Sequence, residues 1–349
     1  MEASRERYFA AANSANGFVN YFPQIFGMGR CQRLYVVKGG PGTGKSCFMK
    51  QVGASAEKKG LPVTYYHCSS DADSLDGLMI GNGEIGILDG TSPHAWEPQL
   101  AGAFEQIVNL GDFWNADLLR ARKQEIERLA QKKAEGYQSA YRYLAACGQI
   151  MRALAIGAET VWEREKAERA ADRLVKKYGW TGKGFRESIG LCDSIGMSGR
   201  VRFDTYEVLS DTLYTVSDVI DTAFLFFDAL YKACRHHGVN VKVSRNPILP
   251  ERIDALTMVD SAVTFSLEGE GERLNMRRFI HEDAYKQCRR ERRRDLLLAE
   301  QLVQCAEECL RQVKESHFSM EAMFYEAMDF EAKEQFTEAF CKKVIENRL

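Results

Sequence analysis

The sequence predicts an α/β fold with a parallel sheet, present in two copies. Short apolar runs typical of strands occur at residues 34–37, 63–68 and 85–88, and residues 47–58 between the first two have helical spacing of their apolar side chains. Strands alternating with helices at these lengths indicate βαβ units, in which ligands bind at the carboxyl ends of the strands. The second half repeats this spacing, which indicates an internal duplication.

The first strand and the first helix flank a glycine-rich loop, residues 39–46, which matches the phosphate-binding pattern G-x-x-x-x-G-K-[ST]. Its glycines let successive backbone N–H groups converge on phosphate oxygens, and the start of the following helix adds unpaired N–H groups. We therefore expect a nucleoside triphosphate, with ATP as the cofactor together with Mg²⁺. The residues expected to bind it are Gly39, Gly40, Pro41, Gly42, Thr43, Gly44, Lys45 and Ser46.

Three side chains are predicted to act on the phosphates directly. Lys45 would reach the β- and γ-phosphates, and Ser46 would offer its hydroxyl to Mg²⁺. Asp89 follows an apolar strand, as expected of a Walker B carboxylate that holds the metal's water shell. Asp71 ends the preceding strand and is the candidate for positioning the attacking group, whereas for Asp73 a helix-capping role is favoured.

Two histidines, His67 and His94, fall at the same predicted sheet edge. Either could contact phosphate or transfer a proton, although a hydrogen-bonded structural role is the favoured interpretation. Arg120 and Arg122 are candidates for the cation that phosphoryl transfer requires. The basic run at residues 289–294 is interpreted first as solvated helix surface, with an anionic partner, nucleic acid or a cation acting in trans as alternatives.

The duplication is seen when the two halves of the sequence are aligned so that Gly60 matches Gly238 and Asp76 matches Asp254. In that register the glycine-rich loop falls on residues 217–224, and Lys45 meets Ala223. Residues 201–231 contain neither glycine nor lysine. We therefore expect the second copy to be degenerate, with neither a backbone nest nor a cation for a triphosphate.

The predicted domains are residues 1–180, a nucleotide-binding domain with a helical arm at about 115–177, and residues 185–349, a degenerate copy with C-terminal helices. The arm is expected to be a helical hairpin, and the glycines around residues 178–184 mark the linker.

Composition limits the possible environments. The chain has 349 residues, of which 45% are hydrophobic and 28% charged, as is ordinary for soluble proteins. The net charge of −2 argues against a general polyanion binder. No apolar stretch approaches the length of a membrane span, and the ten cysteines include no C-x-x-C pair, so we expect a cytoplasmic protein without structural zinc or disulfides.

Several sequence blocks together resemble one known family. They are Gly-Phe-Val-Asn at 17–20, His-Cys-Ser-Ser-Asp at 67–71, Asp-Gly-Thr-Ser-Pro-His at 89–94, Asn-Leu-Gly-Asp-Phe-Trp at 109–114 and Ala-Met-Asp-Phe at 327–330. With the glycine-rich loop they resemble, over nearly the whole chain, an uncharacterised bacterial family of tandem P-loop ATPase-like proteins. The resemblance implies nucleotide binding without an established substrate. Members often carry the loop in both halves, and this chain departs from that pattern.

The expected function is Mg-ATP binding with slow or partner-regulated hydrolysis, and the second half is structural or regulatory. A small-molecule kinase is an alternative, with Asp71 deprotonating the acceptor and the helical arm as a lid. A nucleotide-gated binding module with negligible turnover is another. An unidentified protein or nucleic-acid partner is compatible with each of these functions.

Overall fold

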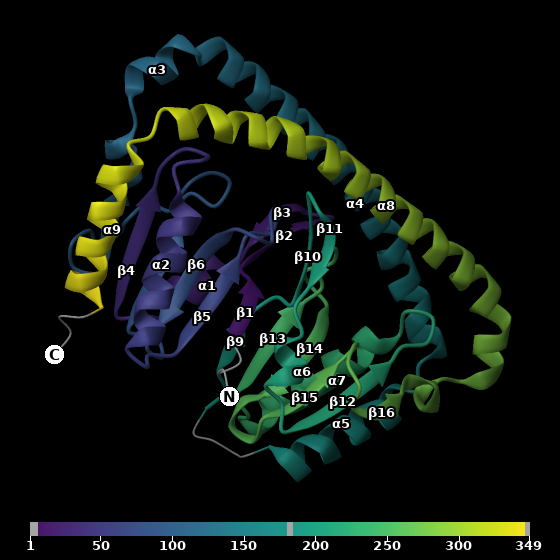
Figure 1. Ribbon diagram of the computed structural model, residues 1–349. Helices are drawn as coiled ribbons and strands as arrows, with labels where there is room; N and C mark the ends of the chain where they lie inside the picture. Colours follow the sequence, from purple (N-terminus) through teal and green to yellow (C-terminus); the bar gives the residue numbers. More distant parts are fainter. Residues whose placement is uncertain (1–5, 180–183, 346–349) are drawn as a thin grey trace.

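Two six-stranded sheets lie next to each other, and a pair of long helices spans both of them, in the computed structural model, which describes residues 6–179 and 184–345 (Figure 1). The α/β class and the two-copy arrangement predicted from the sequence are confirmed. The sheets, however, are mixed and not parallel.

The first sheet has the strand order β1-β5-β6-β7-β4-β8. Its strands are β1 (Glu6–Phe9), β5 (Val63–His67), β6 (Leu75–Ile80), β7 (Ile85–Asp89), β4 (Arg33–Lys38) and β8 (Glu105–Asn109). β4 is parallel to β7 and β8, whereas β6 is antiparallel to both of its neighbours. The prediction missed β6. Only residues 68–74 separate it from β5, which leaves no room for a crossover helix, so the chain turns back as a hairpin.

The second sheet repeats this order strand for strand, as β9-β13-β14-β15-β12-β16. Its strands are β9 (Glu187–Ile189), β13 (Val241–Arg245), β14 (Ile253–Met258), β15 (Val263–Ser266), β12 (Thr212–Ser217) and β16 (Glu272–Asn275). The irregularity in pairing recurs at the equivalent point, at Tyr66/His67 in the first sheet and at Ser244/Arg245 in the second. This agrees with the register predicted from Gly60 and Gly238.

Each copy also has a small β-hairpin and short helical segments. They are β2 (Ala11–Ser14) with β3 (Gly17–Asn20), β10 (Asp193–Gly196) with β11 (Gly199–Arg202), α1 (Phe22–Phe26), α6 (Thr205–Val208), and the 3₁₀ helices Leu110–Phe113, Val259–Ser261 and Met276–Phe279. One longer helix follows the equivalent strands β4 and β12: α2 (Lys45–Lys58) and α7 (Ala223–His237). The apolar face predicted for α2 is confirmed, since Phe48, Met49, Val52 and Ala56 are buried.

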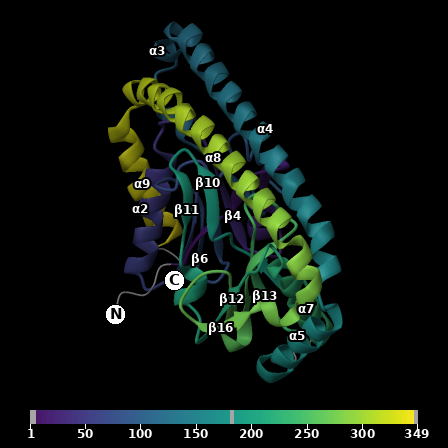
Figure 2. The same cartoon turned by 90° about the vertical axis from the view of Figure 1, so that its right-hand side faces the viewer.

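The long helices run antiparallel. They are the 39-residue α4 (Lys123–Val161), preceded by α3 (Ala116–Ala121), and the 45-residue α8 (Glu282–Glu326) (Figures 1 and 2). Their ends are joined reciprocally: Asn115 N–H donates to Ala327 O at 2.7 Å, and His281 N–H donates to Val161 O at 2.9 Å. The expected hairpin within residues 115–177 is therefore not formed, because α4 pairs with α8 from the other half of the chain.

The helix that follows each long helix packs on the sheet formed by the other half of the chain. α5 (Arg164–Tyr178) places Ala171 and Val175 in the core of the second sheet, and α9 (Phe330–Val344) places Phe340 in the core of the first. A helix of α4's length extends about 60 Å, which carries the chain from one sheet to the other. The first lobe is thus the first sheet with α1, α2 and α9, and the second lobe is the second sheet with α5, α6 and α7. A boundary at residues 180–185 does not separate these lobes, and most of the predicted linker lies outside the described residues.

Candidate functional site

The glycine-rich loop joins the end of β4 to the start of α2, in the strand-to-helix setting that the sequence predicts. Gly42 and Gly44 have φ values of 70° and 79°, in the left-handed region that favours glycine. Gly44 is the N-cap residue, immediately before α2. The N–H groups of the first turn of α2 have no partners within the helix, so this end of the loop presents donors to an anion.

Lys45 and Asp89 meet at this loop. The Lys45 ammonium donates to Gly39 O at 3.1 Å and to Gly40 O at 2.7 Å, and it lies 3.6 Å from Asp89 Oδ2. The other carboxylate oxygen of Asp89 accepts hydrogen bonds from the N–H and hydroxyl of Thr91. Both charged side chains are largely buried, at 12% and 11% exposure, which strengthens their attraction.

Ser46 and Asp71 lie at the same edge of the sheet. Ser46 Oγ accepts the Leu75 N–H at 3.0 Å, which fixes the hydroxyl at the start of β6. The Asp71 carboxylate closes the turn between β5 and β6 by accepting the Ser74 hydroxyl at 2.6 Å. Asp73 is exposed, and its backbone carbonyl accepts a hydrogen bond from the Lys50 ammonium. Its N–H donates to the Asp71 carboxylate, so Asp73 helps to form the turn.

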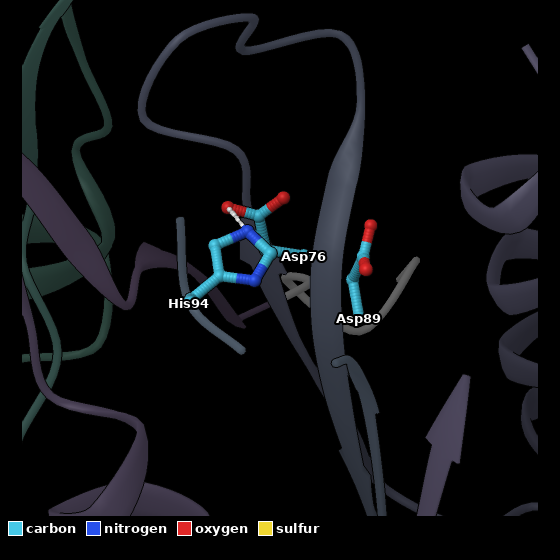
Figure 3. A group of neighbouring side chains, drawn as sticks. All are labelled: Asp76, Asp89 and His94. Carbon is cyan, nitrogen blue, oxygen red and sulfur yellow. Dashed lines mark ion pairs between the residues drawn. The ribbon is translucent and has the colours of Figure 1, made fainter. Parts of the chain in front are cut away.

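A buried group of Asp76, Asp89 and His94 adjoins the loop (Figure 3). Their ligand atoms lie within 4.8 Å of one another, as a metal site requires. In Figure 3 His94 and Asp76 face each other, and a dashed line marks their ion pair, with 3.5 Å between His94 Nε2 and Asp76 Oδ2. No ion pair is drawn to Asp89.

Whether this group could bind a metal depends on the protonation state of His94. Burial lowers the pKa of His94, but Asp76 and Asp89 outweigh it and raise the pKa above the ordinary value. A protonated imidazole has two N–H donors and no lone pair for a metal. A protonated His94 would pair with Asp76, whereas a neutral His94 would keep one ring nitrogen able to bind a metal, and Asp89 Oδ2 faces Lys45. The sequence prediction missed Asp76, although an aspartate inside an apolar strand was a visible signal.

His67 and Lys38 have structural partners. His67 Nδ1 lies 2.6 Å from Ala72 O, and Lys38 donates to the carbonyls of Gly90 and Trp96, both at 2.8 Å. These bonds order the loops after β5 and β7.

Residues from the second half of the chain pack against the loop. A Cβ atom at Gly40 would lie 2.4 Å from the Phe324 ring, and one at Gly42 would lie 2.3 Å from the backbone oxygen of Glu321. Both contacts come from the C-terminal part of α8. The sequence prediction could not place these residues at the loop, because it did not foresee the exchange of helices between lobes.

The predicted cation candidates are held in ion pairs with carboxylates. Arg120 pairs with Asp117 and is 75% exposed, and Arg122 pairs with Glu326 at 2.6 Å. In the basic run at 289–294, Arg292 is only 4% exposed. The interpretation of this run as solvated surface is therefore wrong for Arg292.

The second loop, residues 217–224, does contain a backbone nest, contrary to the sequence prediction. The Asp218 carboxylate accepts the N–H groups of Val219, Asp221, Thr222 and Ala223 at 2.7–3.0 Å. An anion of the protein itself thus fills the position that a phosphate would take.

Two arginines also reach the second loop from outside residues 201–231. Arg292 donates to Ile220 O at 2.8 Å, and Arg252 pairs with Asp221 at 2.6 Å. Ile220 and Asp221 have φ values of 53° and 60°, so the nest forms without glycine. Both guanidinium groups bond to the loop itself, Arg292 to a backbone carbonyl and Arg252 to Asp221, so the expectation that the second loop has no cation for a triphosphate stays a prediction.

Comparisons with protein-family models, with curated proteins and with solved structures found no match. Across the two described segments of the chain, no helix combines the length and apolar character that crossing a bilayer requires.

Proposed function

We propose that this protein binds Mg-ATP at the glycine-rich loop and hydrolyses it slowly or under the control of a partner. The observation that carries the proposal is the Lys45–Asp89 contact of 3.6 Å beneath a strand–loop–helix turn of the phosphate-binding sequence pattern. An ammonium and a metal-directed carboxylate at the same anion nest are what a Mg-triphosphate needs.

The residue roles follow from the geometry. The N–H groups of Gly40 and of residues 42–46 and the Lys45 ammonium would bind the phosphates, and Ser46 and Asp89 would hold Mg²⁺. Bound Mg²⁺ neutralises charge on the phosphates. Asp71, in the turn after β5, would orient the attacking water.

The packing of α8 on Gly40 and Gly42 supports slow or regulated turnover. Phe324 and Glu321 restrict access to the loop, so nucleotide exchange would require this end of α8 to move. A partner that shifts the long helices would then control the rate.

ATP turnover by purified protein tests this proposal, with Lys45→Ala and Asp89→Asn beside the wild type. Lys58→Ala, at the far end of the same helix α2, is the matched control. We expect phosphate release by the wild type and the control, and loss of binding or turnover in the two site variants. Equal turnover in all four proteins would refute the assignment, and γ-phosphate recovered on a metabolite in place of free phosphate would indicate a kinase.

A further inference from the structure

We propose that Lys133 of α4 is a further catalytic residue, which contacts the γ-phosphate of the nucleotide and neutralises the charge that develops there. The inference rests on the proposed function and adds to it the cation that the sequence did not locate.

Lys133 is linked to the glycine-rich loop through α8. Its ammonium lies 3.1 Å from His317 Nδ1, and His317 Nε2 lies 3.5 Å from Glu321 Oε1. Glu321 is the residue whose backbone packs on Gly42. The two long helices therefore bring Lys133 to the loop from opposite halves of the chain.

α4 also packs on the turn that holds Asp71. One helical turn after Lys133, the Tyr137 hydroxyl donates to Ser70 Oγ at 2.8 Å. Residues one turn apart lie on the same face of a helix, so Lys133 faces the carboxyl end of β5. That edge is where the γ-phosphate and the attacking water would lie, next to Lys45.

The electrostatic environment agrees with this position. Burial lowers the pKa of Lys133, Cys68 and Glu321 act against that effect, and Lys45 lowers the pKa further. Lys45 and Lys133 are thus two cations close enough to repel each other. A polyphosphate placed between them would relieve this repulsion.

The second lobe provides an internal comparison. The reciprocal bonds at the helix ends make residues 115–161 equivalent to residues 281–327. In this register Lys133 corresponds to Ala299, whose side chain is buried and uncharged.

The neighbours of Lys133 follow the same pattern. His317 corresponds to Met151 and Glu321 corresponds to Ala155. At the other end of the helix pair, Arg292 of α8 joins the helices by donating to Leu154 O of α4 at 2.7 Å, and it also donates to Ile220 O of the second loop. Lys133, His317 and Glu321 have no counterpart there in this register and lie at the end that adjoins the Gly-Lys-Ser loop, which ties them to the ligand of that loop.

In the proposed step, water attacks the γ-phosphorus, and the bond from that atom to the bridging oxygen breaks. The electron pair of that bond leaves on ADP, and the proton of water passes to Asp71 or to solvent. Lys133 keeps its proton throughout and donates hydrogen bonds to the γ-phosphate oxygens as their charge redistributes.

The test compares Lys133→Ala and Lys133→Arg with the wild type, and Lys132→Ala is the matched control. Lys132 is the neighbouring lysine, it is 59% exposed, and it pairs with Glu315 on the helix surface. Two quantities are measured in each protein: the affinity for ADP with Mg²⁺, and the affinity for ADP with aluminium fluoride, which imitates the transferring phosphoryl group. Single-turnover hydrolysis of ATP is followed in parallel.

For Lys133→Ala we expect unchanged ADP affinity, and a loss of about 100-fold or more in both aluminium fluoride trapping and hydrolysis. Lys133→Arg should recover part of the loss, and Lys132→Ala should match the wild type. If Lys133→Ala bound ADP with aluminium fluoride within threefold of the wild-type affinity, this inference would be overturned and the proposed function would stand. A wild type that binds neither ATP nor ADP would overturn the proposed function, and the inference with it.

Discussion

The buried His317 gives the sharpest prediction about stability. Its side chain is 17% exposed and lies 3.1 Å from the Lys133 ammonium. Burial, Lys133 and Lys45 lower the pKa of His317 from 6.5 to about 4, with Asp71 acting in the opposite direction. The folded protein therefore resists protonation of a group that protonates readily in the unfolded chain.

The sign and size of the effect follow from linkage. Well above pH 6.5 His317 is neutral in both the folded and the unfolded state and has no effect on stability. As the pH falls from 6.5 toward 4, the unfolded state gains a proton that the folded state does not, so the free energy of unfolding decreases. Between pH 7 and pH 5 the expected loss from this one group is about 2 kcal/mol.

Urea unfolding at pH 7 and pH 5 measures the effect, with His317→Gln beside the wild type. Glutamine can still accept a hydrogen bond from Lys133, but it does not titrate. The variant should lose about 2 kcal/mol less than the wild type on acidification, and the other histidines cancel in this comparison. His236→Gln, at an exposed position in α7, is the control and should retain the wild-type loss. An equal loss in His317→Gln and the wild type would refute the reasoning.

Three further predictions concern the loops and the exchanged helices. Asp218→Ala removes the acceptor of four N–H groups in the second loop, and should lower the free energy of unfolding by about 1–2 kcal/mol in urea titrations. Phe340→Ala, which removes a ring 5.0 Å from that of Phe48, should cost about 3–5 kcal/mol, whereas Phe318→Ala at a 43% exposed site should cost little. Glu321→Gln should tighten ATP binding several-fold in equilibrium titrations, because a carboxylate no longer lies at the phosphate site.

The Glu321 prediction also has a pH dependence. Burial and Asp71 raise the pKa of Glu321, and the Gly42 N–H, Lys133 and Lys45 act in the opposite direction. As the pH falls, the wild-type carboxylate takes up a proton, so the difference in ATP affinity from Glu321→Gln should shrink. A constant difference across pH, or weaker binding by the variant, would contradict this role for Glu321.

Unchanged unfolding midpoints would contradict the two stability predictions. For Asp218→Ala, such a result would mean that the carboxylate does not hold the second loop. For Phe340→Ala, it would mean that α9 does not complete the core of the first lobe.

The sequence predicted local features of the fold well. The β4–loop–α2 segment and the buried face of α2 follow from hydrophobic spacing and glycine content, both of which act within a few residues. Residue types at strand ends likewise placed Asp89 beside Lys45. The duplication was visible because the two halves share a register from Gly60 and Gly238 onward.

The missed features depend on contacts between distant residues. Helical periodicity shows which face of α4 is apolar but not that α8 covers it, so Lys133, Glu321 and His317 could not be placed at the loop. Similarly, a nest without glycine could not be predicted at residues 217–224, because it depends on the Asp218 carboxylate bonding its own backbone. Glycine content was therefore a sound signal for the first loop and a misleading one for the second.

A structure of the wild-type protein with Mg²⁺ and a non-hydrolysable ATP analogue tests the central claim most directly. The account predicts phosphates on the N–H groups of Gly40 and of residues 42–46, Lys45 turned from the carbonyls of Gly39 and Gly40 toward phosphate oxygens, and the second loop still closed on Asp218. A glycine-rich loop that stays empty at saturating analogue, or an analogue bound elsewhere, would contradict it.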